Sequence, residues 1–449
     1  MNYQEFKQAV IAAAAEKEVK DYELYYSESA ETQTEIFKTE VKGFATGSNL
    51  GVCLKCLVNG KMGYASTEHL SEEEAVSLVE RALENAKSIE SDEQAFIHTK
   101  GDTYTVLEKE EVKLPTAAEV IDFALDLQKQ IYATDNRVVD GTQAYAGFVE
   151  SKTALYNSNG LDLEDSAAFS FTYGMAVVAE GEEMYDGMEV SSGKFESFDI
   201  EKIAKEAVKD AVDTIGAESV PSGKYPVVFS NKVMASMLST YSSVFSAEAA
   251  QKGLSLLKGK EGEKIAADIV TLTDDPMRAD ALVKATFDDE GVATYKKNVI
   301  EGGQFVTLLH NLKTAAVAGV KTTGNGHKAS YASNVGIRPY SFFINPVKGT
   351  LDDLMAEAGN GIYVTSVEGM HAGANPITGD FSLAASGFCI TDGKKGKPVK
   401  SITVSGNFFT LLKEIASVGE DLKFNPFALG SSRCGSPSVL IKEMTIAGK

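Results

Sequence analysis

The stretch GVCLKCLVNGKMGYAS, residues 51–66, predicts a β-hairpin. Two largely apolar runs flank Asn59-Gly60, a dipeptide that suits the two left-handed positions of a tight hairpin turn. A helix is predicted to follow, because Ser71 and Glu74 have the spacing of a capping box. Its apolar stripe, at helical spacing, consists of Val76, Val79, Leu83 and Ala86. A hairpin followed by such a helix indicates an antiparallel sheet covered by helices.

The same order of elements is predicted a second time. The first copy begins with a helix at about 4–17, followed by strand-like runs that lead into the hairpin. The second copy begins with a helix at Thr116, where Glu119 completes another capping box, and ends with a helix at about 199–216. Its strand-like runs include KTALYNSNG (152–160) and AAFSFTYGMAVVAEG (167–181).

Two prolines and a glycine in ESVPSGKYPVV (218–228) indicate a domain boundary. The fold class that we predict is α+β. An N-terminal domain of helices and antiparallel strands spans residues 1–220 and contains an internal duplication of about 1–100 and 110–217. A β-rich C-terminal domain spans residues 221–449.

The C-terminal part is predicted to contain mainly strands. Hairpins are expected at 295–310, turning at Gly302-Gly303, and at 381–404, turning at DGKKGK. Short helices are expected near 231–247, 311–318, 350–358 and 407–416, with Asn311 and Asn407 as N-caps. Residues 320–333, VKTTGNGHKASYAS, show no apolar periodicity and predict a long, mobile loop of the kind that often has a function.

Composition excludes several classes of function. The 449 residues include 43 Lys and Arg against 64 Asp and Glu, a formal net charge of −21. Such a surface repels phosphate backbones and anionic lipids, so direct nucleic-acid binding is not expected. No apolar stretch approaches the ~20 residues of a membrane span, and the charged N-terminus lacks the pattern of a signal peptide. Four cysteines do not suggest a disulfide framework, so we expect a protein of the reducing cytoplasm.

Most of the chemically suggestive residues have simpler interpretations. Cys53 and Cys56 form a CxxC pattern, but within a strand they point to opposite faces. The serines of Ser386-Gly387 and Ser405-Gly406 lack the GxSxG pattern of a nucleophilic serine. TTGNG (322–326) and EGG (301–303) match no phosphate-binding loop.

The candidate metal ligands also lack a recognisable pattern. The five histidines share no helical turn; they are His69, His98, His310, His327 and His371. A site assembled from distant loops by the last three, all in the C-terminal part, stays open. The clusters Asp274-Asp275 and 288–290 lie beside turn signals and are interpreted as solvated turn carboxylates rather than as a cation site. Cys434, in SSRCGSPS, is interpreted as a structural thiol, and its role stays open.

Six phrases in the C-terminal half, in this order, resemble the TldD/PmbA family, whose members are also described as modulators of DNA gyrase. They are KGKEGEKIA (258–266), FDDEGVATYKKNVIEGGQF (287–305), GVKTTGNGHKASYA (319–332), GANPITGDFSLAASGF (373–388), PVKSITVSGNF (398–408) and VGEDL (418–422). The 51–66 hairpin resembles the N-terminal domain of the family. The resemblance implies a cytoplasmic, two-domain member of a metallopeptidase family linked to the degradation and maturation of small or unfolded peptides.

The resemblance also implies a choice between two branches. The TldD type carries His-Glu-x-x-x-His on a helix and a further cysteine ligand near the C-terminus, whereas the PmbA or TldE type lacks that motif and pairs with the first. In this chain the helix expected at 237–253, MLSTYSSVFSAEAAQKG, precedes KGKEGEKIA, where the catalytic branch carries its motif. It contains no histidine, and Glu248 has no histidine partner. No ligand role is carried over to Cys434.

We therefore expect a metal-free, PmbA-type subunit of a peptidase complex, with no catalytic residue, no metal ligand and no cofactor. It is expected to form a homodimer in isolation and a heterodimer with a HExxxH-bearing TldD-type subunit, and to bind peptide but neither nucleic acid nor membrane. The expected lining of a peptide channel is the loop of Thr322, Thr323, Gly324, Asn325, Gly326 and His327. The alternatives are an independent peptide-binding protein without peptidase activity and a protein-binding modulator of DNA gyrase.

Overall fold

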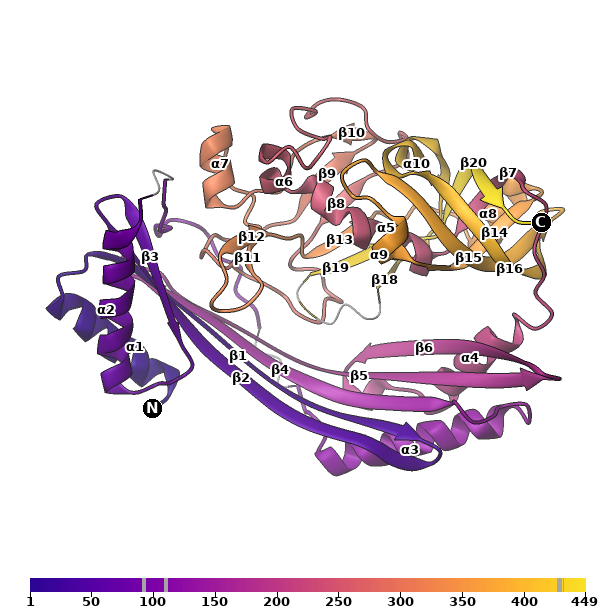
Figure 1. Cartoon of the computed structure of the whole chain (residues 1–449), viewed down its shortest axis with the longest axis horizontal. Helices are drawn as coiled ribbons and strands as arrows, with labels where there is room; N and C mark the ends of the chain where they lie inside the picture. Colours follow the sequence, from indigo (N-terminus) through magenta and orange to yellow (C-terminus); the bar gives the residue numbers. More distant parts are fainter. Residues whose placement is uncertain (91–93, 109–111, 426–429, 431) are drawn as a thin grey trace.

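The computed structural model describes residues 1–90, 94–108, 112–425, 430 and 432–449. The chain has an N-terminal and a C-terminal domain, both of mixed helix and strand, as the α+β prediction requires. In Figure 1 the C-terminal domain lies above the long, curved strands of the N-terminal domain. No described helix is long and apolar enough to cross a membrane.

The N-terminal domain repeats one order of elements, helix, three strands, helix. The first set is α1 (Tyr3–Glu16), β1 (Asp21–Phe37), β2 (Glu40–Val58), β3 (Lys61–Thr67) and α2 (Glu72–Ser88). The second set is α3 (Ala117–Thr134), β4 (Gln143–Asn157), β5 (Asp162–Glu180), β6 (Glu183–Gly193), the short 3₁₀ helix η1 (Phe195–Ser197) and α4 (Ile200–Val212). The strands form one antiparallel sheet in the order β3-β2-β1-β4-β5-β6, so β1 and β4 meet at its centre and the two sets extend in opposite directions. The helices of the two sets lie at opposite ends of the sheet (Figure 1).

Both sets use the same close contact between a strand glycine and a helix. A side chain at Gly63 of β3 would meet the carbonyl oxygen of Ala82 at 2.0 Å and the amide nitrogen of Ala86 at 2.3 Å. At Gly187 of β6 the corresponding distances to Ala207 and Ala211 of α4 are 2.4 and 2.2 Å. Only glycine lets helix and strand backbones approach this closely.

Local signals begin the helices where the sequence predicts. Ser71 accepts a hydrogen bond from the amide of Glu74 at the start of α2, and Thr116 and Glu119 form a complete capping box at the start of α3. At α2 the Glu74 carboxylate does not return a hydrogen bond to the backbone of Ser71, because it pairs with Arg81 at 2.7 Å instead. The predicted hairpin turn is also present, with positive φ angles of 53° at Asn59 and 78° at Gly60.

The C-terminal domain contains two six-stranded sheets and a small ribbon. One sheet has the order β10-β9-β8-β13-β19-β18, with β8 (Leu272–Asp274), β9 (Lys297–Glu301), β10 (Gln304–Phe305), β13 (Ser341–Ile344), β18 (Lys423–Phe424) and β19 (Arg433–Ser436). The other has the order β16-β15-β14-β7-β20-β17, with β7 (Gly223–Phe229), β14 (Gly361–Glu368), β15 (Asp380–Thr391), β16 (Lys394–Asn407), β17 (Ile415–Val418) and β20 (Val439–Ala447). An additional pairing of β16 with β20 closes this second sheet into a barrel. The ribbon consists of β11 (Gly326–Lys328) and β12 (Val335–Ile337).

The predicted short helices and hairpins of this domain are present. The hairpins β9–β10 and β15–β16 turn at Gly302-Gly303 and Asp392-Gly393. Helices α7 (Leu312–Ala318), α8 (Leu351–Ala358) and α10 (Phe408–Glu414) lie where helices were expected, and the short helix α9 (Met370–Gly373) was not predicted. Asn311 and Asn407 cap α7 and α10 as expected.

The single helix expected at 237–253 is wrong. Helix α5 (Asn231–Tyr241) passes into the 3₁₀ helix η2 (Ser242–Phe245), and a separate short helix, α6 (Ala247–Gln251), begins after Ser246. Ser246 is extended and its side chain accepts a hydrogen bond from the amide of Ala249, so it caps a new helix instead of continuing the old one. The apolar face predicted for this segment is buried in the domain core; it consists of Val233, Met237, Tyr241 and Val244.

Cys53 and Cys56 point to opposite faces of β2, as predicted. Cys56 packs in the core beneath α1 and α2. Cys53 belongs to a cluster with Tyr25 and Phe287 that joins the two domains. Both are buried, free cysteines.

Candidate functional site

The predicted channel loop contains the strand β11 and is held in place by hydrogen bonds to residues 288–290. The Gly326 amide donates to Asp288 Oδ2 at 2.8 Å, the Asp289 amide donates to the Gly326 carbonyl at 3.0 Å, and the Lys328 amide donates to Asp289 Oδ2 at 2.7 Å. A side chain at Gly326 would come within 2.9 Å of Glu290 Oε2. The prediction of an irregular loop is therefore wrong over Gly326–Lys328.

Four of the six predicted loop residues are buried, namely Thr323, Gly324, Asn325 and Gly326. Asn325 is fully buried, and its amide donates to Asp274 Oδ2 at 2.8 Å and to the Arg338 carbonyl at 3.0 Å. Thr322 and His327 are partly exposed, and His327 lies 3.2 Å from a carboxylate oxygen of Asp289. Within this loop, Thr322 and His327 are the residues whose side chains a peptide could reach directly.

The interpretation of the acidic clusters as solvated turn carboxylates is wrong for Asp274, Asp288 and Glu290. Their exposed fractions are 0, 1 and 8 %. Asp288 Oδ1 accepts the amides of Glu290 at 2.9 Å and Val292 at 3.0 Å, while Glu290 Oε2 accepts the Leu312 amide at 2.7 Å. These carboxylates organise loops by accepting hydrogen bonds from backbone N–H groups. The hydrogen bonds offset part of the free-energy cost of burying the carboxylates.

Burial raises the pKa values of both Asp288 and Glu290. Burial and repulsion from Glu290 raise the pKa of Asp288 well above its usual range. Burial also raises the pKa of Glu290, and the Lys55 ammonium from β2 opposes that rise. Lys55 is itself buried and pairs with its cross-strand neighbour Glu23 at 2.6 Å. The N-terminal sheet therefore contributes charge to a carboxylate pair of the C-terminal domain.

The same region joins the two domains. The Tyr25 hydroxyl of β1 donates to Asp289 Oδ1 at 2.9 Å, and the Tyr331 hydroxyl donates to Glu68 at 2.6 Å. The Tyr331 ring lies over Gly51 of β2, where a side chain would overlap it at 2.1 Å. We therefore interpret residues 288–290 together with the loop as a domain junction.

The raised pKa values predict how stability changes with pH. A carboxyl whose pKa is higher in the folded than in the unfolded chain binds more protons when folded. Stability from this pair is therefore complete only below the ordinary carboxyl pKa of about 4, and it is lost progressively as the pH rises from there to the raised values. Glu290→Gln keeps an oxygen for the Leu312 amide and removes the repulsion on Asp288. We expect the fall in thermal midpoint between pH 5 and pH 8 to be a few degrees smaller in this variant than in the wild type.

Differential scanning fluorimetry across that pH range checks the prediction. Glu301→Gln, at an exposed position in β9, is the matched control and should show the wild-type dependence. The interpretation would be contradicted by identical pH dependence in all three proteins.

Cys434 lies in β19, close to Ser239 of α5. Burial raises the pKa of the Cys434 thiol to about 12, and the interaction with the Ser239 side chain opposes this rise. The thiol is therefore protonated at neutral pH and is a poor nucleophile and ligand. The histidines lie on separate elements, and His310, next to α7, is buried with a pKa lowered by that burial. Among the residues that the structure describes, no three His, Cys, Asp or Glu side chains are grouped to hold a metal ion.

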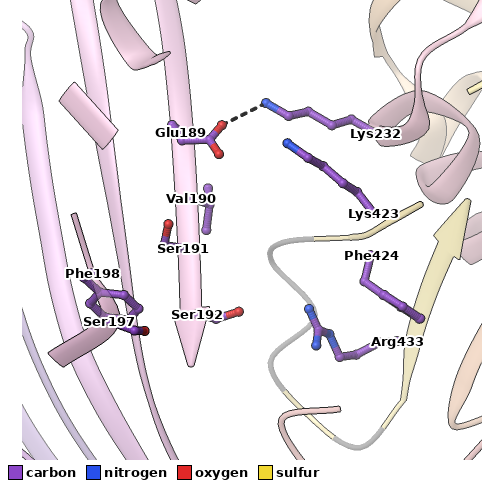
Figure 2. A pocket seen from close by; sticks show the side chains of 10 residues that line it. All are labelled: Glu189, Val190, Ser191, Ser192, Ser197, Phe198, Lys232, Lys423, Phe424 and Arg433. Atoms are coloured by element: carbon purple, nitrogen blue, oxygen red, sulfur yellow. Dashed lines mark hydrogen bonds and ion pairs between the residues drawn. The ribbon is translucent and has the colours of Figure 1, made fainter. Parts of the chain in front are cut away.

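A pocket of about 340 Å³ lies between the domains (Figure 2). Its N-terminal wall is β6, the last strand of the N-terminal sheet, with Glu189 and Ser192 on it. Its C-terminal wall is formed by Lys232 at the start of α5, Lys423 and Phe424 of β18, and Arg433 of β19. Three basic side chains and one acidic side chain line it, on a chain whose net charge is −21.

The basic residues of the pocket were not predicted as site residues. Arg433 lies in SSRCGSPS, where only the neighbouring Cys434 was considered as a site residue. Lys423 follows VGEDL and belongs to no motif of its own. Their one sequence signal is that they are isolated basic residues in an acidic chain. The pocket forms only because β6 and β18, more than 200 positions apart, end their sheets on opposite sides of the same gap.

Three profiles of one metallopeptidase family match consecutive parts of the chain. Residues 22–86, 110–215 and 222–448 match the profiles described as PmbA/TldA metallopeptidase domain 1, central domain and C-terminal domain. The chain belongs to the PmbA/TldD metallopeptidase family, as the six phrases indicate.

Three relatives illustrate the range of similarity. A crystal structure of a Thermotoga maritima protein, described as a proposed modulator of a DNA gyrase, is 32% identical over 99% of this chain and 100% of its own, with a TM-score of 0.89. A metalloprotease from Methanothermobacter thermautotrophicus is 28% identical over 397 residues, covering 87% of this chain and 85% of its own. TldE from Thermococcus kodakarensis is 23% identical over 98% of this chain and 99% of its own, again with a TM-score of 0.89, and it supports the fold.

The family name implies a metal ion, and the described residues around α5, η2 and α6 do not fit one. Metal sites of peptidases use neutral imidazole, thiolate or carboxylate ligands. Along α5, η2 and α6, residues 231–251, there is no histidine, and the sole carboxylate, Glu248, pairs with Lys252 at 2.6 Å. The nearby Cys434 thiol is buried and protonated. We derive no catalytic step through a metal in this chain.

Proposed function

We propose that this chain is the metal-free subunit of a PmbA/TldD-type peptidase complex that acts on small or unfolded peptides in the cytoplasm. The observation that carries the proposal is the donor set of α5, η2 and α6, which offers hydroxyls and a paired carboxylate where the catalytic branch of the family carries its metal-binding motif. Family membership supplies the peptidase context. This chain would contribute shape and peptide contacts, and its partner would contribute the activated water.

An exposed apolar surface supports assembly with a second subunit. Val317 and Val320, at the end of α7, are 69 and 53 % exposed, and Leu256, after α6, is 57 % exposed. A hydrogen bond of 2.8 Å from the Gln251 side chain to the Thr314 carbonyl ties α6 to α7. Exposed apolar side chains gathered on neighbouring elements favour a protein interface.

We expect the isolated chain to be a homodimer and to form a 1:1 heterodimer when a HExxxH-bearing homologue is added. Light scattering coupled to size exclusion, at micromolar concentration, measures both states. Val317→Glu combined with Leu256→Glu should shift the dimer toward monomer, because charge is costly to bury at an interface. The control is Val106→Glu, at a position that is 91 % exposed in the N-terminal domain. A strict monomer with and without the homologue would favour the independent peptide-binding protein instead.

A further inference from the structure

The lining of the interdomain pocket contains more cations than carboxylates. Lys423 is exposed and makes no ion pair with any described residue. The Nε atom of Arg433 is buried without a hydrogen-bond partner in the described part of the chain. A guanidinium can donate five hydrogen bonds, so an unused, buried Nε indicates unmet donor capacity.

The Arg433 side chain is held in a fixed position. Its guanidinium carbon lies 5.3 Å from the centre of the Phe424 ring, and Arg278 lies 5.2 Å from the same ring. Arg278 pairs with the Asp280 carboxylate. Stacking on an aromatic ring orients a guanidinium and reduces the entropy it loses on binding. Arg433 is therefore preorganised, and it shares the nearby carboxylate of Asp280 with Arg278.

The acidic side of the pocket is weak. Glu189 on β6 is its one carboxylate, and it already forms an ion pair with Lys232 at 3.4 Å (Figure 2). Lys423 extends toward β6, and Arg433 lies farther along the same wall (Figure 2). The charged ends of Lys423 and Arg433 lie at different points along this wall, so each would pair with its own negative group (Figure 2). The Ser192 side chain points toward them from β6 (Figure 2).

We propose that this pocket binds a peptide that carries negative groups, with one carboxylate at Lys423 and another at Arg433, so that the chain prefers acidic peptide segments; the proposal rests on the peptide role above. Each carboxylate can come from a C-terminus or from an Asp or Glu side chain, since both present the same two oxygens to a guanidinium fork. The local field favours such a group, although the protein as a whole repels anions.

The test is binding of fluorescein-labelled octapeptides to the isolated chain, measured by anisotropy. A Glu-containing peptide should bind about tenfold more tightly than its Gln-matched counterpart, and added salt should reduce the difference. Lys423→Gln and Arg433→Gln should each remove part of this preference, and the double variant should remove most of it. Lys258→Gln, at an exposed position after α6, makes the same charge change outside the pocket and should bind like the wild type.

A variant that binds the acidic peptide more tightly is informative, because a damaged fold would weaken binding and not strengthen it. Glu189→Gln removes the competing carboxylate and should strengthen binding about twofold to threefold. Lys423 is exposed, so its substitution tests the pocket even if the Arg433 variant does not fold. Gln-matched peptides that differ only in a free or amidated C-terminus distinguish the two sources: tighter binding of the free acid assigns the terminal carboxylate, and tighter binding of Glu over Gln in amidated peptides assigns the side chain.

Equal affinity for Glu and Gln peptides together with equal affinity for free and amidated termini would overturn the proposal. So would unchanged binding in both the Lys423 and the Arg433 variant. Because no partner is present in this assay, its failure leaves the subunit role intact. A preference for acidic peptides in the isolated chain would uphold the pocket, and the subunit role is tested separately by light scattering and by peptidase activity with the homologue.

Discussion

Mixed with a HExxxH-bearing homologue, the chain is expected to give chelator-sensitive cleavage of an unfolded peptide, and alone it is expected to give none above the buffer rate. Neither an activated water nor an activated nucleophile can be assigned to its described residues. The one buried thiol beside α5, Cys434, stays protonated because burial raises its pKa to about 12. Enzymes accelerate reactions by about 10⁶-fold or more, so the difference between mixture and single chain should exceed about 10³-fold.

The measurement is the release of fluorescence from a quenched casein or peptide substrate. The chain should be produced in a host that lacks the catalytic homologue, since traces of that protein would mimic activity. A homologue with its first motif histidine replaced by alanine is the control, and it should abolish cleavage in the mixture. Chelator-sensitive peptidase activity in the chain alone, accompanied by about one tightly held metal per chain, would contradict the proposed subunit role.

The parts of the fold that could be predicted are those encoded within a few residues. Asn59-Gly60 specifies its turn because few dipeptides accept two positive φ angles, and Thr116, Asn311 and Asn407 begin helices because their side chains satisfy nearby amides. The opposite facing of Cys53 and Cys56 follows from strand periodicity alone. Each of these signals depends only on residues that are close in the sequence, so it can be recognised without knowing the tertiary structure.

The features that escaped prediction depend on partners distant in the sequence. Asp288 next to a turn signal suggests a solvated carboxylate, yet the Gly326 amide 38 positions away makes its burial tolerable. Ser246 ends one helix and begins another inside an apolar pattern that suits a single helix, and the Ala247 amide is bonded to Leu309 of another segment. The pocket joins β6 to β18 and β19 across the domain gap, so no sequence window contains it.

Gly63→Val is expected to destabilise the N-terminal domain by about 3 kcal/mol, because the added side chain meets helix backbone. Its Cβ would lie 2.0 Å from the Ala82 carbonyl oxygen and 2.3 Å from the Ala86 amide nitrogen, and neither can rotate away as a side chain would. Helix α2 must therefore move outward and loosen its packing against α1, at the upper end of the usual cost of overpacking. The strand propensity of valine, worth at most ~1 kcal/mol, does not offset this.

Thermal unfolding followed by circular dichroism checks the effect, with an expected fall in midpoint of about 6–12 °C for a domain of this size. Gly187→Val should behave alike, because its Cβ would meet the α4 backbone at 2.2 Å in the second set of elements. Gly47→Val is the matched control: it lies in β2 with nothing within 4 Å of the added carbon and should melt within about 1–2 °C of the wild type. If Gly63→Val and Gly187→Val melt like Gly47→Val, the close strand–helix contact is not a source of stability. If both fall together, the two halves share a packing constraint as well as an order of elements, which is the physical result expected of a duplicated unit.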